Sequence, residues 1–164
     1  MKDLYIVRHG KSTWDIEGIS DIDRPLKERG INDGYKMAER LLVEDKIPEM
    51  IISSPAVRAL HSASIFARTF NFPYSDITIN EGIYHAGTSM MLSIIQQTDD
   101  NIKSLMVFGH NPTFTDLSNI FVNNKIANVP TTGIVGLKFE TNTWKGLEKL
   151  KPKDWFFDFP KNKI

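Results

Sequence analysis

Four side chains of this sequence combine residue types that bind and transfer a phosphoryl group. Arg8 and His9 follow the apolar run at residues 4–7 with no turn residue between, Arg58 comes shortly after a second apolar run, and His110 follows a third. Arginine presents a planar fork of N–H donors that matches phosphate oxygens, and a neutral histidine is a recognised covalent nucleophile. The set predicts a phosphoryl site if the fold brings these residues together.

Short apolar strands and amphipathic helices alternate along the chain and would position these side chains. The runs that predict buried strands are residues 4–7, 50–52 and 105–108, with residues 76–79 as a weaker candidate. The helical patterns are residues 26–42 after Pro25, the segment after Ser54 and Pro55, residues 89–97, and the segment opening near Pro112. In the second helix we expect Ser54 to be the N-cap and Pro55 to lie in the first turn.

This alternation predicts an α/β fold in a single domain over residues 1–164. We expect a three-layer α/β/α sandwich with a mainly parallel central sheet and helices on both faces. Residues 134–140 and 143–150 predict a hairpin across Thr141 and Asn142. Because ligands bind at the carboxyl ends of the strands in open α/β sheets, the two arginines and two histidines should face one cleft.

Composition narrows the classes of function. Hydrophobic residues make up 41% and charged residues 24% of the chain, and 20 basic residues balance 20 acidic ones, so there is no electrostatic case for nucleic-acid binding. The absence of cysteine excludes a disulfide framework, a thiolate zinc site and a cysteine nucleophile. Since there is neither a signal peptide nor an apolar stretch near the ~20 residues of a membrane span, we expect a cytoplasmic protein without membrane contact.

Three motifs carry a resemblance to a known family. The segments VRHGKS, SSPAVRA and GHNP resemble, in the family's order, the motifs of the histidine phosphatase superfamily, the phosphoglycerate mutase-like clan. The segments KSTWD, DRPLKERG, YHA and PTTGIVGLKF are similar to those of its small single-domain SixA-type phosphohistidine phosphatases. The resemblance extends from about residue 4 to residue 140 and implies a phosphoglycerate mutase-like fold.

The resemblance also implies roles for the four side chains. His9 would take the phosphoryl group as a phosphohistidine, Arg8 and Arg58 would hold its oxygens, and His110 would donate to the developing charge. His9 must then be neutral to attack, whereas His110 should favour the cation beside phosphate. No cofactor and no metal is required.

Other residues near the motifs are further candidates for contact with substrate or for proton transfer. Lys11 and Asn111 are predicted to contact substrate, as are Ser12 and Trp14 on the loop after His9. Mutases and many ester phosphatases of the superfamily use a carboxylic acid near the end of the third strand to protonate the leaving alkoxide. The nearby candidate here is Glu81, which is either that acid or a surface residue.

Several simpler interpretations stand beside these roles. Arg8 and His9 could be a strand-end ion pair, and a zinc site from His9, His85 and His110 is conceivable although their spacing is not that of helix-borne ligands. We expect His61 to be a helix-face histidine, and Asp23-Arg24-Pro25 to fix the start of the first helix. Tyr84 and His85 either line the pocket or pack beside it, and the aromatic tail from residue 151 should dock on the sheet.

We therefore expect a metal-independent phosphatase that acts on phosphohistidine in proteins. A phosphatase of small phosphoesters on the same site is the first alternative, and a non-catalytic phosphate- or phosphoprotein-binding module is the second. The sequence leaves the physiological substrate and the oligomeric state open.

Overall fold

The computed structural model, which describes residues 1–163, is built around one six-stranded sheet. Its strands are Lys2–Arg8 (β1), Met50–Ser53 (β2), Ile77–Ile79 (β3), Ser104–Gly109 (β4), Ile134–Phe139 (β5) and Asp154–Asp158 (β6). They lie in the order β3-β2-β4-β1-β5-β6. The first four of this order pair in parallel, and β5 and β6 are antiparallel to their neighbours.

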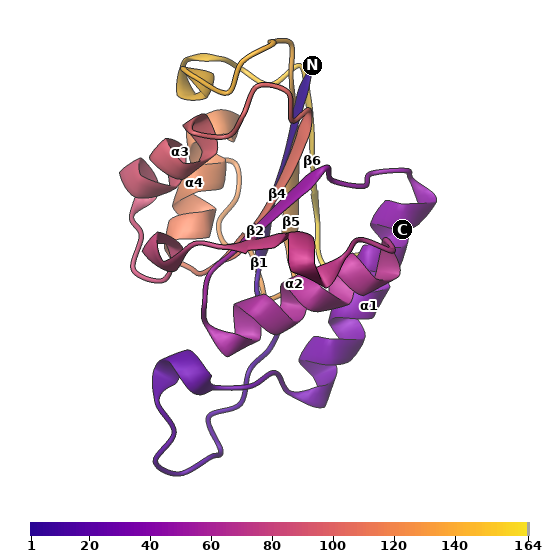
Figure 1. The fold of residues 1–164 in the computed structure, drawn as a ribbon, viewed down its shortest axis with the longest axis vertical. Coiled ribbons are helices and arrows are strands. Elements are labelled where there is room, and N and C mark those ends of the chain that lie inside the picture. Colours follow the sequence, from indigo (N-terminus) through magenta and orange to yellow (C-terminus); the bar gives the residue numbers. More distant parts are fainter. Residues whose placement is uncertain (164) are drawn as a thin grey trace.

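Two pairs of helices cover the two faces of the sheet. The helices are Glu28–Val43 (α1), Val57–Thr69 (α2), Thr88–Gln96 (α3) and Thr113–Val122 (α4). Figure 1 shows α1 and α2 on one face and α3 and α4 on the other, which confirms the predicted three-layer sandwich with a mainly parallel sheet. Within residues 1–163, every helix is too short or too polar to cross a bilayer.

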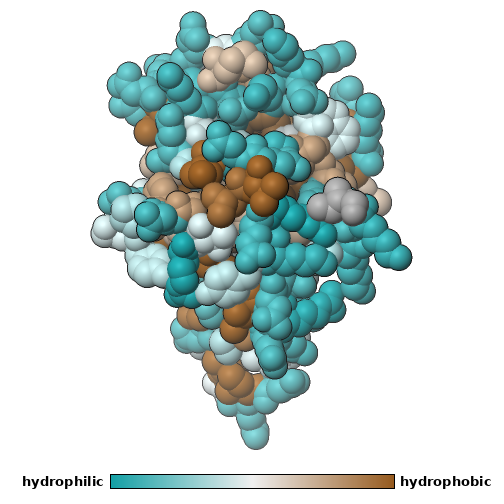
Figure 2. Space-filling model, turned by 90° about the vertical axis from the view of Figure 1, so that its right-hand side faces the viewer, coloured by the Kyte–Doolittle hydropathy of each residue, from teal (hydrophilic) through white to brown (hydrophobic). Residues whose placement is uncertain are grey.

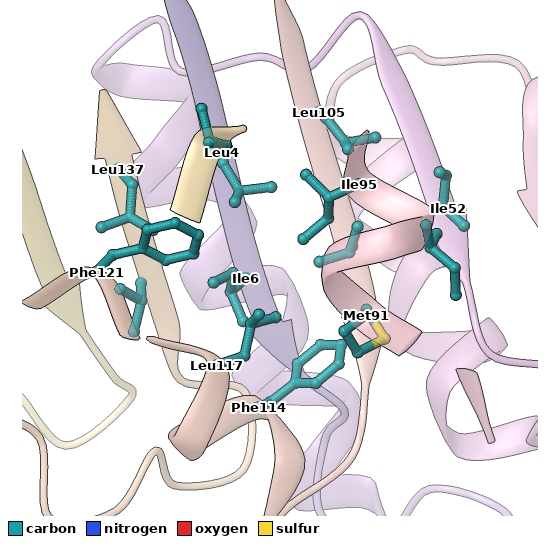
Figure 3. Close-up of a cluster of buried hydrophobic side chains, with 14 of the residues drawn as sticks. Leu4, Ile6, Ile52, Met91, Ile95, Leu105, Phe114, Leu117, Phe121 and Leu137 are labelled. Carbon is teal, nitrogen blue, oxygen red and sulfur yellow. The ribbon is translucent and has the colours of Figure 1, made fainter. Parts of the chain in front are cut away.

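β1 runs through the middle of the sheet and sends its side chains into two cores. Leu4 and Ile6 are fully buried in the core beneath α3 and α4, and Figure 3 shows them in the same cluster of side chains as Phe114. Tyr5 and Val7 lie in the opposite core, beneath α1 and α2. Burial on both faces explains why the strand is a continuous apolar run in the sequence.

α1 lies on the sheet through a narrower apolar face than its sequence suggests. Met37, Ala38 and Leu41 are buried, but Leu42 is 41% exposed. Leu26, which fits the helical pattern, precedes the helix and pairs with Ser12 in an isolated antiparallel bridge. The helix therefore starts two residues later than the pattern begins.

The predicted hairpin across Thr141 and Asn142 is wrong. β5 pairs with β6 instead, and the ring of Phe156 on β6 packs so closely on Gly136 that no Cβ would fit there. Trp144, in the segment predicted as the partner strand, is fully buried in the core beneath α3 and α4, and its indole N–H donates to the Ile102 carbonyl at 2.9 Å. Part of the aromatic tail thus docks on the sheet as its edge strand.

Candidate functional site

The carboxyl ends of three neighbouring strands meet at one edge of the sheet. β1 pairs with β4 as far as Arg8 and Gly109, and β2 pairs with β4 up to its own last residue. His9, Ser54 and His110 follow these three strands directly, so their side chains emerge at the same edge. The imidazoles of His9 and His110 lie with ring centroids 5.2 Å apart. Strand pairing thus brings together residues that are far apart in the sequence.

An open cavity of about 330 Å³ lies over this edge. Arg8, His9, Arg58 and His110 line it, as the sequence predicts, and so do Lys11 and Asn111. The expectation that two arginines and two histidines face one cleft is thereby met in the geometry.

His9 is held as a neutral imidazole with no proton on Nε2. Its Nδ1 lies 2.7 Å from the Gly10 carbonyl oxygen, and because a carbonyl oxygen only accepts, Nδ1 carries the proton and donates. Burial, together with the nearby His110, Arg58 and Arg8, lowers the pKa of His9 to about 3, although the hydrogen bond to Gly10 acts in the opposite direction. The lone pair of Nε2 is therefore available at neutral pH.

The backbone after His9 is fixed by α1 and α2. The Gly10 N–H donates to the Ser62 hydroxyl on α2 at 2.9 Å. On the other side, Gly30 of α1 lies so close to the Lys11 backbone that a Cβ would overlap it. Glycine at this position lets the helix support the turn that follows the histidine.

Arg58 projects from the first turn of α2, as predicted, and is 6% exposed. Its Nη1 donates to the Asp21 carbonyl at 2.7 Å and its Nη2 to the Asp21 carboxylate at 3.0 Å. These bonds hold the guanidinium with Nε 3.4 Å from His9 Nε2. The fork is thus oriented before any ligand binds.

Ser54 is not the helix cap that we predicted. Ala56 is the N-cap residue, and Pro55 lies before the helix rather than in its first turn. The Ser54 hydroxyl instead accepts the Ala56 N–H at 3.2 Å and lies 2.7 Å from Nε2 of His110. Ser54, which we expected to cap α2, therefore forms a hydrogen bond with His110.

His110 has an unpaired nitrogen near the cavity. Burial and, to a smaller extent, the charge of Arg58 lower the pKa of His110 to about 4, so the imidazole is neutral in the protein without ligand. Its Nδ1 is buried and has no hydrogen-bond partner among residues 1–163. Since an unpaired buried polar atom is costly, this nitrogen is well suited to bind a ligand oxygen.

Arg8 and Asn111 both bond to the Val129 carbonyl, but they differ in what remains for a ligand. Arg8 donates to it from Nη1 at 3.0 Å, and its Nε is buried without a partner among residues 1–163. The Asn111 amide donates to Val129 and Asn128 and accepts from Thr115. Asn111 lines the cavity, yet its polar atoms are bonded to the protein.

Asp21 and Arg24 line the cavity but were not predicted as site residues. The Asp21 carboxylate accepts from the Tyr84 hydroxyl, from Arg58 and from Arg24 Nε, and these donors hold the pKa of Asp21 well below its usual range. Arg24, expected to fix the start of α1, is 6% exposed and also donates to the Ser12 hydroxyl at 2.9 Å. Asp21 and Arg24 are spaced i, i+3, which places both side chains on one side of a short helical turn. This spacing is the feature of the sequence that could have predicted their ion pair.

The remaining candidates lie at or beyond the edge of the site. Glu81 is exposed at the start of the short turn Glu81–Ile83 and does not line the cavity. Tyr84 joins the site, since its hydroxyl bonds to Asp21 and its ring lies 5.5 Å from that of His110. His61 is half-buried on α2 away from the cavity wall, and burial lowers its pKa.

The zinc interpretation finds no support in the geometry of the described chain. Residues 1–163 contain no group of three or more His, Asp or Glu side chains arranged to hold a metal ion. His9 and His110 are neighbours, but His85 is exposed and does not line the cavity.

Proteins of known sequence resemble this chain over most of its length. Residues 4–84 match the model of the histidine phosphatase superfamily, branch 1. An uncharacterised chloroplastic protein of Arabidopsis thaliana is 25% identical over 161 residues, which cover 93% of this chain and 73% of that protein.

Solved structures share the fold. A structure assigned as the phosphohistidine phosphatase SixA of Agrobacterium tumefaciens has a TM-score of 0.78 at 26% identity and covers 94% of this chain and 97% of its own. A structure of the protein histidine phosphatase SixA with tungstate has a TM-score of 0.77 at 21% identity and covers 96% and 97%. By the matched segment, the shared fold and the RHG motif, of which Arg8 and His9 line the cavity, the chain resembles the histidine phosphatase superfamily.

Proposed function

We propose that this protein is a phosphatase that hydrolyses phosphohistidine in proteins through a covalent phosphohistidine on His9. The observation that carries the proposal is the unprotonated Nε2 of His9 in a cavity shared with Arg8, Arg58 and His110. A nucleophile for phosphorus needs an available lone pair and fixed positive charge around the phosphoryl oxygens. Both are supported by the geometry of this cavity.

The reaction proceeds in two displacements. In the first, His9 Nε2 attacks phosphorus and forms a P–N bond while the bond to the leaving imidazole breaks. The leaving nitrogen keeps the bonding pair and takes up a proton from solvent. In the second, water attacks the phosphohistidine, orthophosphate departs and His9 Nε2 recovers its lone pair. Arg8 and Arg58 hold the oxygens throughout, and the negative charge of the phosphoryl group favours a proton on His110.

The acid–base properties of the cavity support phosphohistidine as the substrate. Asp21 is the one carboxylate among the cavity-lining residues of the described chain, and its lowered pKa keeps it ionised. It cannot supply the proton that an alkoxide leaving group needs, help that contributes ~10²- to 10⁴-fold. Glu81 lies outside the cavity wall. An imidazole is a better leaving group than an alkoxide, so phosphohistidine depends less on such an acid.

A comparison of substrates tests the proposal. A phosphohistidine peptide should turn over faster than alkyl phosphates, and ester rates should rise steeply from alkyl to nitrophenyl phosphate. Glu81→Gln should leave phosphohistidine turnover unchanged. If alkyl esters and phosphohistidine turn over comparably and Glu81→Gln slows both equally, a general acid serves every substrate and the phosphohistidine assignment fails.

Trapping of labelled phosphate tests the covalent step. The wild-type protein should acquire an acid-labile, base-stable label during turnover, and His9→Ala should acquire none and lose turnover while keeping the fold and some phosphate affinity. Near-normal turnover by His9→Ala would exclude the covalent mechanism. Phosphate binding by the wild type with no turnover of any substrate would favour the binding-module alternative.

A further inference from the structure

Residues 13–23, which we call the cavity loop, connect β1 to α1 beside the phosphoryl cavity. Figure 1 shows this connection projecting at the lower end of the molecule, beyond the strands. Its sequence, TWDIEGISDID, intersperses apolar with acidic side chains and contains no basic residue. Trp14 and Asp21 line the cavity itself, so the loop forms part of its rim.

Large apolar side chains of the cavity loop face solvent. Trp14 is 71% exposed, Ile16 46% and Ile22 36%. Figure 2 shows hydrophobic side chains at the tapering lower end of the molecule, where Figure 1 places this loop. Clustered exposed apolar residues mark interaction sites, and tryptophan is enriched among the residues that dominate binding energy.

The loop is ordered before a partner binds. The Arg24 guanidinium lies 3.4 Å from the centroid of the Trp14 ring, and it donates to the Ser12 hydroxyl and the Thr13 carbonyl. Asp21, at the far end of the loop, is bonded to Arg24, Arg58 and Tyr84. Because the backbone and the tryptophan are already held, binding here loses little conformational entropy.

The charge of the loop is opposite to that of the cavity. Asp15, Glu17 and Asp23 form no ion pair with any residue of the described chain 1–163, so their negative charge is directed to solvent. A free phosphate anion gains nothing from such a rim. A protein surface with basic side chains around its phosphorylated histidine would be attracted by the rim and by the cavity together.

We propose that the cavity loop is the docking surface for the protein substrate, and that this substrate presents its phosphohistidine among basic and apolar side chains. The inference rests on the proposed function. The phosphohistidine enters the cavity, Trp14, Ile16 and Ile22 contact apolar side chains of the substrate, and Asp15 and Glu17 attract its basic ones.

Three substrates separate docking from phosphoryl transfer. Two peptides of equal length each carry one phosphohistidine made with potassium phosphoramidate, one flanked by Lys and Leu and the other by Glu and Ser. Phosphoramidate itself is the third and reaches only the cavity. We expect the wild-type protein to show the higher kcat/KM for the Lys/Leu peptide.

The double variant Ile16→Ser/Glu17→Lys changes the loop at two residues that do not line the cavity. On the Lys/Leu peptide it should lose about tenfold in kcat/KM through KM, as expected for the loss of an apolar contact and a favourable charge. Its turnover of phosphoramidate should equal that of the wild type. The matched control is Val43→Ser/Glu39→Lys, at exposed positions near the other end of α1, which should change neither.

Equal kcat/KM for the two peptides, or an unchanged Lys/Leu peptide rate in the double variant, would overturn the docking role. So would a parallel loss on phosphoramidate, because the loop would then act through the cavity. If the wild type hydrolyses none of the three substrates, the proposed function fails. Docking can then be measured directly by the fluorescence anisotropy of labelled peptides. Tighter binding of the Lys/Leu peptide that the double variant weakens would support the surface, and equal binding would overturn it.

Discussion

Arg58→Lys tests whether the cavity depends on the geometry of a guanidinium or on positive charge alone. Arg58 uses Nη1 and Nη2 on Asp21, at 2.7 and 3.0 Å, and directs Nε towards His9. A lysine ammonium is a point charge that can replace only one of these positions. Losing one preorganised donor to a developing charge costs ~10²- to 10³-fold in kcat, or about 2.7–4 kcal/mol. We therefore expect kcat to fall by at least ~10²-fold.

The assay is steady-state kcat with nitrophenyl phosphate and with a phosphohistidine peptide, with the melting temperature recorded to show that the variant is folded. Arg68→Lys is the matched control, because Arg68 lies in the last turn of the same helix, is exposed and donates to the Tyr74 hydroxyl. It should keep the wild-type kcat. If Arg58→Lys retained kcat within about threefold of the wild type, a change under 1 kcal/mol, charge alone would suffice and the reasoning would be refuted.

Three further predictions concern pH, metals and packing. The pKa values of His9 and His110, about 3 and 4, lie below the ~6.5 of an unfolded histidine, so the native state binds fewer protons than the unfolded state. The free energy of unfolding should therefore fall as pH drops below ~6.5. In urea titrations, His9→Asn should reduce this fall. EDTA should leave turnover unchanged, because the charge stabilisation we propose comes from side chains; loss restored by zinc or magnesium would contradict this. Gly109→Ala should destabilise the protein by ~1–3 kcal/mol in denaturant titrations because its Cβ would overlap the Phe114 ring, whereas Gly87→Ala, with no atom within 4 Å, should not.

The predictable parts of this protein are those that local patterns encode. The buried run at residues 4–7 reads as a strand because both of its faces meet helices, and the same holds for β4. His9 and His110 could be placed in one cleft because each directly follows a strand of a parallel sheet, whose carboxyl ends share an edge. The starts of the helices are predicted less accurately, because Leu26 and Pro55 both lie before the helices to which their patterns assign them. Where a helix begins depends on contacts outside the helix itself.

The failures arose where distant parts of the chain decide the structure. Trp144 lies in a segment with a plausible strand pattern. Its side chain is instead buried in the core beneath α3 and α4 and hydrogen-bonded to the Ile102 carbonyl, so the segment does not pair with β5. Arg24 precedes a proline, which indicates the start of a helix. In the structure, hydrogen bonds to Ser12 and Asp21 place its side chain in the cavity wall. Neither outcome is visible in a local window of sequence, because the competing partner lies outside that window or in a loop without periodicity.

The pairing of β1 with β4 must form before the cavity that we propose as the active site is complete. Arg8 and Gly109 are neighbours in the sheet although they are about a hundred residues apart in the chain. Contacts between such distant segments carry a large loop-closure cost and form slowly. A nascent chain that has not yet reached β4 holds His9 without His110, and a partly unfolded chain that loses this strand pair separates them again. Phosphatase turnover during refolding would therefore report the completed central sheet rather than any early collapsed state.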